Sequence, residues 1–368
     1  MTLNQALTRR NNNFDLLRLI AACAVIVGHA HALVLNDTSS DAVADLLGFD
    51  YSGSLAVKFF FFLSGLVVTN SLIEKPRAIP FAIARLCRLM PGLIVCVLLS
   101  ALILGPLVSS LTPRAYFADV HTWTYIKANI SLRPQWDLPG VFLGHRNLGV
   151  NGSLWTLPIE VFCYLVLAAF GFCGTFRYRS VGSAVMAGII VYAVASPTYL
   201  AMFGFNGAEP QLLPACFAFG AFLALNKHDV ELNLRVMAGL LLFRGIFHNT
   251  PMVSLVFYAA LFYGSLVVAT WPPLARARMP GDFSYGIYLY GFPLQQLMVD
   301  LFPMWNAHRN QAASLAAALL AGACSWYLVE RPAMRLGRHL IARSARFAMT
   351  GQEAPRVASM AESGFPAE

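Results

Sequence analysis

Residues 14–35 read FDLLRLIAACAVIVGHAHALVL. The run is apolar apart from a few ionisable side chains, and it matches the length of about 20 residues that one membrane-spanning helix needs. No A-x-A-like cleavage site follows its apolar part within this stretch. We therefore interpret it as a retained first helix rather than as a signal peptide that is removed.

The rest of the chain repeats this pattern. Of its 368 residues, 58% are hydrophobic and 12% are charged, whereas a soluble domain carries about 25% charged residues. Further long apolar runs lie at 93–108, 181–195, 253–269 and 312–329. The composition excludes an ordinary soluble domain and predicts an all-α integral membrane protein.

The apolar runs predict a bundle of about ten spans within a membrane domain at 14–331, which follows a short N-terminal segment at 1–13. The spans are expected near 14–35, 55–73, 91–111, 151–172, 181–201, 210–226, 233–249, 252–271, 284–302 and 311–330. The longest connector, 112–150, is predicted to be a partly structured external loop. A basic and then disordered tail is expected at 332–368.

The positions of the basic residues orient this bundle. Few lysines and arginines fall in the connectors of one side, namely Arg114, Lys127, Arg133, Arg146 and Arg309, and most of the others fall on the opposite side. The positive-inside rule then places both termini in the cytoplasm of a multi-pass inner-membrane protein.

The net charge of +8 fits the same interpretation. The basic residues separate apolar runs, so contact with membrane lipids is favoured over nucleic-acid binding. The seven cysteines show no metal-ligand spacing, and we expect neither a metal site nor a disulfide.

Two ionisable residues share one face of the first span. Arg18 and His29 are eleven residues apart, which returns almost to the same face of a helix and separates them by about 16 Å along its axis. Ionisable groups within spans usually face an interior site. The alternatives are that Arg18 reaches the headgroups and that His29 is a hydrogen-bonded packing residue.

Glu160 lies within the fourth span, about 13 Å from its outer end. A lone carboxylate at that depth needs a partner, and His29 is the first candidate. A histidine oriented by a carboxylate makes a good general base. The alternative is a structural ion pair with Arg244 or Lys58.

Arg85 and Arg88 belong to a basic cluster before Pro91, which suits the start of the third span. From the cluster alone, topology and anionic lipid are the default interpretation. The alternative is a site for the phosphates of a nucleotide-like donor, since arginine binds phosphate in a bidentate manner.

Two further segments combine aromatic and small residues. Ser64 follows Phe59–Phe62 and, with Gly65, could let a helix or an acyl group approach closely. Tyr285 begins the ninth span, where it either belongs to the interfacial aromatic belt or lines a polar pathway.

Taken in order, these segments resemble the membrane-bound acyltransferase family 3. The matching elements are FDLLR at 14–18 with His29, FFFLSG at 60–65, RLCRLMP at 85–91, SLWTLPIE at 153–160, SYGIYL at 284–289 and ERP at 330–332. The resemblance covers nearly the whole chain. One departure is Gly291, where members of the family often have a histidine, so no role of that histidine is carried over.

The resemblance implies an O-acyltransferase that acts on a cell-surface polysaccharide, its lipid-linked precursor or a small antibiotic-like molecule. It implies an acyl-CoA donor, which we expect to be acetyl-CoA. In the resulting hypothesis Arg18, Arg85 and Arg88 hold the donor, with Ser64 and Tyr285 beside it. His29, oriented by Glu160, either deprotonates the acceptor hydroxyl or carries the acyl group itself.

A transporter or flippase for a lipid-linked sugar is the rival class, because it would also bury charged residues. Such proteins often show inverted repeats and broken helices. The sequence shows no such repeat, which favours the acyltransferase.

Overall fold

The structure, a computed structural model, describes residues 1–8, 11–34, 39–196, 200, 210–246, 250, 252–277 and 279–344. In these ranges every named element is a helix, and the only bridge pairs Thr2 with Glu231. The elements are α1 (Leu3–Ala6), α2 (Phe14–Leu33), α3 (Ala42–Leu47), α4 (Ser52–Glu74), α5 (Ala78–Leu99), η1 (Ser100–Leu104), α6 (Gly105–Val108), α7 (Pro113–Ala118), α8 (Val120–Ile130), η2 (Gly152–Trp155), α9 (Thr156–Phe172), η3 (Thr175–Arg177), α10 (Arg179–Ala195), η5 (Pro210–Leu212), α11 (Leu213–Leu225), α12 (Leu234–Ile246), α13 (Val253–Ala269), α14 (Pro272–Arg276), α15 (Ser284–Leu301), α16 (Ala307–Ser325) and η6 (Trp326–Glu330).

Five helical stretches of the described chain are long and apolar enough to cross a membrane. They are Phe14–Leu33, Ser52–Glu74, Ala78–Val108, Gly152–Phe172 and Ala307–Ser344. Shorter apolar helices lie at Arg179–Ala195, Pro210–Leu225, Leu234–Phe243 and Val253–Ala269. The chain is thus an all-helical membrane protein, as its apolar runs predict. A helix lies at each predicted span, whereas the number that cross and the side of each terminus stay predictions.

Some predicted boundaries differ from the structure. The prediction that Pro91 begins a span is wrong, because α5 begins at Ala78 and Pro91 lies inside it. Arg85 and Arg88 consequently lie within a helix rather than in a connector. The last helical stretch continues through the basic segment to Ser344. The predicted span ends at 35, 201 and 249 and the tail from 345 lie outside the described residues.

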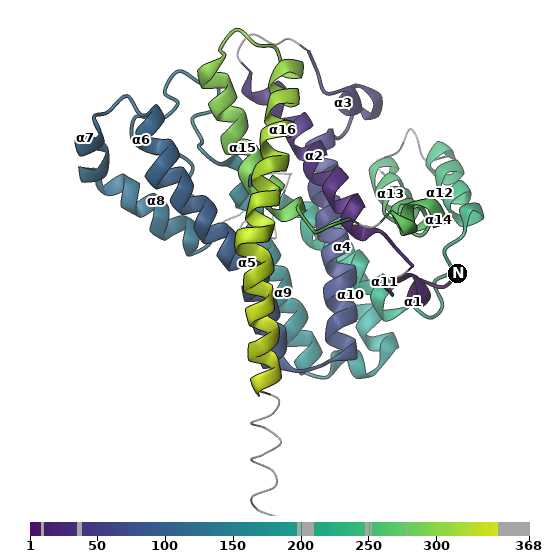
Figure 1. Ribbon diagram of the computed structural model, residues 1–368. Coiled ribbons are helices and arrows are strands. Elements are labelled where there is room, and N and C mark those ends of the chain that lie inside the picture. The colour runs from purple at the N-terminus through teal and green to yellow at the C-terminus, as the bar shows by residue number, and fades with distance from the viewer. Residues whose placement is uncertain are drawn as a thin grey trace, which may run out of the picture.

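The core forms where α4 packs against α2, α9 and α11. A Cβ atom on Gly65 would lie 2.0 Å from the carbonyl oxygen of Phe217, and one on Gly220 would lie 2.0 Å from that of Phe62. The absence of these side chains lets the backbones of α4 and α11 touch, so the expected close helix approach at Gly65 is confirmed. On the other side of α2, α15 and α16 pack against α2 and against each other (Figure 1).

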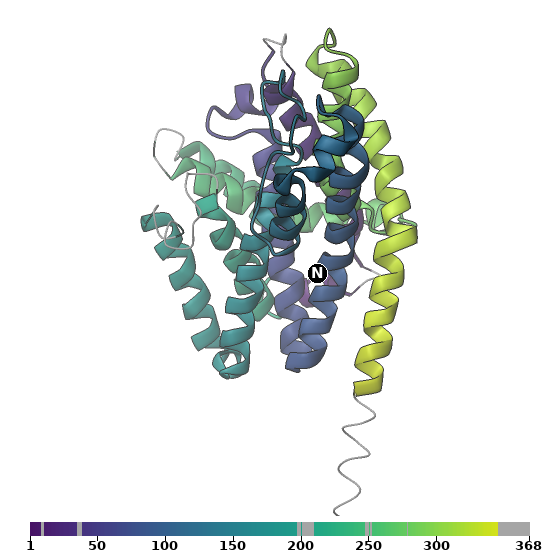
Figure 2. The same ribbon diagram turned by 90° about the vertical axis from the view of Figure 1, so that its left-hand side faces the viewer.

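The connector 112–150 is partly structured, as predicted. It contains α7 and α8, and the buried Tyr116 hydroxyl of α7 donates to the Ala101 carbonyl at 2.8 Å. These short helices project from one end of the molecule near α6 (Figure 1). The helical stretch that begins with α16 runs along one side of the bundle from this end to the other (Figure 2).

Candidate active site

A cavity of about 1070 Å³ lies between α2, α4, α5, α9 and α15. Its walls also include the segment at 275–284 and the helical stretch after Trp326. Six of the predicted site residues line it, namely Arg18, Ser64, Arg85, Arg88, Glu160 and Tyr285. Because three of these are arginines, we call it the arginine cavity.

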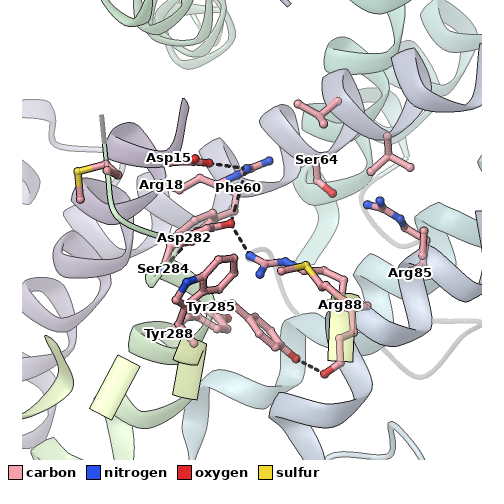
Figure 3. A pocket seen from close by; sticks show the side chains of 18 of the residues that line it. Asp15, Arg18, Phe60, Ser64, Arg85, Arg88, Asp282, Ser284, Tyr285 and Tyr288 are labelled. Carbon is pink, nitrogen blue, oxygen red and sulfur yellow. Dashed lines mark hydrogen bonds and ion pairs between the residues drawn. The ribbon is translucent and has the colours of Figure 1, made fainter. Parts of the chain in front are cut away.

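One carboxylate joins two of the arginines. Asp282 Oδ2 lies 2.6 Å from Arg88 Nη2 and 3.8 Å from Arg18 Nη1. Figure 3 shows Asp282 between these two side chains, which come from α5 and α2. Burial raises the pKa of the Asp282 carboxyl. Arg88, Arg18 and the hydrogen bonds from Ser284 lower this pKa by more than burial raises it, so it lies below its ordinary value. Asp282 therefore forms a close ion pair with Arg88 and a longer one with Arg18.

Arg88 has a second carboxylate and an aromatic support. Its Nη1 lies 3.1 Å from Glu330 Oε2, whose side chain is completely buried, and Ser325 Oγ donates to the other oxygen of Glu330 at 2.9 Å. The ring of Tyr285 lies 5.4 Å from the Arg88 guanidinium, and its hydroxyl donates to the Leu89 carbonyl. The position of Arg88 is thus fixed from three sides.

Glu160 lies in a cluster of hydroxyl groups. Its Oε1 accepts hydrogen bonds from Tyr164 at 2.5 Å and from Ser64 at 3.2 Å, and the two hydroxyls are 2.8 Å apart. The Tyr164 ring also lies 5.8 Å from the guanidinium of Arg85. The structure therefore brings Ser64, Arg85 and Glu160 together around Tyr164.

His29 lies outside this cavity. Its Nδ1 is 2.8 Å from the Val25 carbonyl oxygen, which can only accept, so Nδ1 carries the hydrogen and Nε2 has the lone pair. The edge of the ring meets Phe292 of α15 at a centroid distance of 5.5 Å.

The expected pairing of His29 with Glu160 is not formed among the described residues, since each has other partners. The Val25 carbonyl, one turn earlier in α2, fixes the tautomer instead. The alternative pairing of Glu160 with Lys58 is not formed either, because Lys58 pairs with Asp50 at 2.8 Å. The side chain of Arg244 lies outside the described residues.

Aromatic residues also line the cavity. Phe60 and Tyr288 lie there with their ring centroids 6.0 Å apart, and the Tyr288 hydroxyl lies 2.6 Å from that of Thr156. Phe60 also packs against a buried cluster formed by Ala22, Ile26, Ile287 and Ala318. Tyr288 lies one helical turn before Phe292, the residue of α15 that contacts His29.

Three residues of the site were missed by sequence reasoning. Tyr164 follows Glu160 by four positions, and this helical spacing could have identified it. Glu330 stands in the ERP segment without a predicted role, and Asp282 lies just outside a predicted span. Neither of these carboxylates is close in sequence to Arg88, so only the fold reveals the contacts.

Gly291 is explained by packing. A Cβ atom at this position would lie 2.8 Å from Ile26 of α2. A histidine therefore does not fit there unless the Ile26 side chain or one of the two helices shifts.

Comparison with known proteins gives one family and two relatives. A family model described as "Acyltransferase domain" matches residues 11–330. An "O-acetyl transferase" of Shigella phage Sf6 is 27% identical over 337 residues, which cover 88% of this chain and 96% of the phage protein. "Nodulation protein 10" of Rhizobium leguminosarum bv. viciae is 29% identical over 381 residues, which cover 92% of this chain and 98% of that protein. No solved structure matches the chain significantly.

Proposed function

The chain belongs to the acyltransferase domain family, and we propose that it transfers an acetyl group from acetyl-CoA to a hydroxyl of a cell-surface polysaccharide or of its lipid-linked precursor. The printed name of the phage relative supports acetyl transfer to oxygen. The apolar helices and the basic connectors support a location in the inner membrane. Membership of this family also favours the enzyme over the transporter.

The observation that carries the donor assignment is that five arginines line one large cavity, namely Arg18, Arg85, Arg88, Arg276 and Arg338. Arg85 has no carboxylate partner among the described residues, and Arg18 has only long contacts of 3.5 Å and 3.8 Å. Both can therefore bind the phosphates of a nucleotide, for which the planar guanidinium is well suited. Arg88 is already paired with two carboxylates and contributes mainly by positioning its neighbours.

In the proposed mechanism His29 is the general base. Its Nε2 takes the proton of the acceptor hydroxyl, the oxygen attacks the thioester carbon, and the carbon–sulfur bond breaks to release CoA as the thiol after proton transfer. Val25 supplies the orientation that a carboxylate was expected to supply. In this proposal the narrow arm of the donor extends along α15 from Tyr288, which lines the cavity, to Phe292, which contacts His29. Ser64, Tyr164 and Glu160 form a polar part of the cavity wall.

Transfer can be tested with purified protein in phospholipid vesicles. The vesicles receive acetyl-CoA with a radiolabelled acetyl group, together with carbohydrate extracted from cells that lack this chain. We expect release of CoA and label on carbohydrate that mild alkali removes, because an O-ester is alkali-labile. Absence of both products would contradict the proposal, and label on a small molecule alone would contradict the acceptor class.

A further inference from the structure

A second pocket lies at the opposite end of the bundle from the basic C-terminal part of the last helix. Its volume is about 400 Å³, and its lining residues include Ser109, Leu143, His145, Val299, Asp300 and Pro303. Two ionisable side chains, His145 and Asp300, stand among hydroxyl and apolar groups there. The volume lies in the range of about 300–1,000 Å³ that small ligands occupy.

His145 is held in one orientation. The side-chain nitrogen of Gln296 donates to the carbonyl oxygens of Asn147 and Gly149, at 2.6 Å and 2.8 Å. The amide oxygen of Gln296 therefore faces Nδ1 of His145 at 3.0 Å, and Nδ1 carries the hydrogen. Consequently only Nε2 of this imidazole is left for another partner.

Nε2 of His145 lies 3.4 Å from Asp300 Oδ1. The histidine side chain is 7% exposed, whereas that of Asp300 is 40% exposed, so the carboxylate keeps oxygen atoms accessible from the pocket. Phe142 stacks on the imidazole at 4.6 Å with its backbone at a φ of 55°. A bulky residue in this left-handed region is strained, and such strain is concentrated at functional sites.

One face of α15 connects this pocket to the arginine cavity. The residues that recur on it at three- and four-residue intervals are Tyr285, Tyr288, Phe292, Gln296 and Asp300. Tyr285 and Tyr288 line the arginine cavity, Phe292 contacts His29, and Gln296 and Asp300 contact His145. The face therefore leads from the donor side, past the proposed base, to the second pocket.

We propose that the second pocket binds a sugar unit of the acceptor. Asp300 accepts hydrogen bonds from its hydroxyl groups, His145 Nε2 is the second polar contact, and Leu143, Val299 and Pro303 contact its apolar face. A carboxylate beside an imidazole suits neutral, hydroxyl-rich ligands. The carboxylate accepts hydrogen bonds from hydroxyls, and Nε2 accepts one when the ring is neutral and donates one when the ring is protonated. This inference rests on the proposed function and adds an acceptor site at the end of the bundle opposite the donor.

The test uses the vesicle assay, with carbohydrate from cells lacking the chain as the varied substrate. We expect Asp300→Asn and His145→Gln to raise the apparent KM for carbohydrate about tenfold or more, since each loses a hydrogen bond to a charged or oriented group. The apparent KM for acetyl-CoA should stay within about twofold of the wild-type value. A general loss of structure would not change one KM and leave the other unchanged. The matched control is His121→Gln, because His121 contacts Asp137 and Gln135 on the surface and lines neither cavity.

The outcomes separate this inference from the proposed function. A wild-type protein that labels no carbohydrate contradicts the acceptor class before any variant is compared. A wild type that labels carbohydrate, together with an Asp300→Asn variant whose KM for carbohydrate is unchanged, overturns the second pocket alone. If His145→Gln fails to insert into the membrane, the Asp300→Asn variant alone tests the proposal. Its partly exposed carboxylate can change to an amide without altering the packing.

Discussion

At the scale of single residues, His29 has the placement that most favours catalysis. Its Nδ1 is fixed by Val25, so its Nε2 is the atom that can accept a proton. We expect His29→Ala to lower acetyl transfer by about 10²–10⁴-fold, the usual contribution of a general base. Radiolabelled transfer in vesicles containing equal amounts of inserted protein measures this.

The matched control for His29 is His31→Ala. His31 is two positions away in the same helix, but it bonds to Ser39 and Gln311 near the end of the bundle. This variant should keep transfer within a few-fold of wild type. If His29→Ala does the same, packing against Phe292 becomes the better explanation of His29.

The arginines of the cavity should differ in what their loss changes. Arg85→Ala should raise the apparent KM for acetyl-CoA about tenfold or more without unfolding the protein, because Arg85 has no carboxylate partner among the described residues. Arg88→Ala should destabilise the fold by about 3–5 kcal/mol, because it leaves the completely buried Glu330 unpaired. Donor titrations and thermal unfolding in detergent separate the two effects.

A double variant sharpens this comparison. Changing Glu330 to Gln in the Arg88→Ala background removes the stranded charge, so the melting temperature should recover in part. An Arg88→Ala protein that is as stable as wild type would show that the pair with Glu330 contributes nothing.

Asp282 predicts a pH dependence of stability. Its pKa is lower in the folded state than in the unfolded chain, where it is about 3.9. The resulting stabilisation is fully present above the unfolded pKa and is lost as the pH falls through the folded pKa. Asp282→Asn should therefore melt at a lower temperature than wild type at pH 7. Acidification below about pH 4 should narrow the gap between the two melting temperatures. A gap that stays constant on acidification would contradict the assignment.

The residues of the site were only partly predictable. The basic cluster before Pro91 and the ionisable residues within apolar runs are conspicuous, and of the predicted site residues all but His29 line the same cavity. Their partners were not predictable, because a contact such as Arg88–Glu330 joins segments that are 242 positions apart. The pairing of His29 with Glu160 was predicted from depth alone, and depth does not specify which faces of two helices meet.

At the scale of helices, the contact between α4 and α11 depends on two glycines. We expect Gly220→Ala to destabilise the protein by about 1–3 kcal/mol, because its Cβ atom would collide with the Phe62 carbonyl and force the backbones apart. Gly188→Ala in α10 is the matched control, since nothing lies within 4 Å of a Cβ atom there. Thermal unfolding of both variants in the same detergent measures this. An equal loss of stability in the two variants would contradict the packing argument.

The helices themselves were largely predictable, since each apolar run corresponds to one. The start of α5 was missed because Pro91 was taken as a helix start, although a proline can also lie within a long apolar helix where it lacks one hydrogen bond. The π-helical turns at η1 and η6 have no clear sequence signal. Glu330 lies at the end of η6, so the irregular turn decides where this carboxylate meets Arg88.

At the scale of the whole molecule, the two cavities lie toward opposite ends of the bundle, which bears on its orientation in the membrane. The arginine cavity is lined by Arg338 near the basic end of the last helix, and the second pocket is lined by the ends of α6 and α15 at the other end. Acyl-CoA is made in the cytoplasm and surface polysaccharide lies outside it. The proposed function therefore requires that these two ends lie on opposite sides of the membrane.

Cysteine labelling of intact cells tests this orientation. The exposed native Cys173 and Cys324 are first replaced by serine, and single cysteines are then placed at the exposed positions Leu46, Lys127 and Arg338. A membrane-impermeant maleimide should label Leu46→Cys and Lys127→Cys from outside, because α3 and α8 lie at the end that carries few basic residues. Arg338→Cys should be labelled only after the membrane is opened, which would place the arginine cavity on the side that supplies the donor. External labelling of Arg338→Cys would place the arginine cavity on the outer side of the membrane, away from cytoplasmic acetyl-CoA. Both the donor assignment and the direction of transfer would then be wrong.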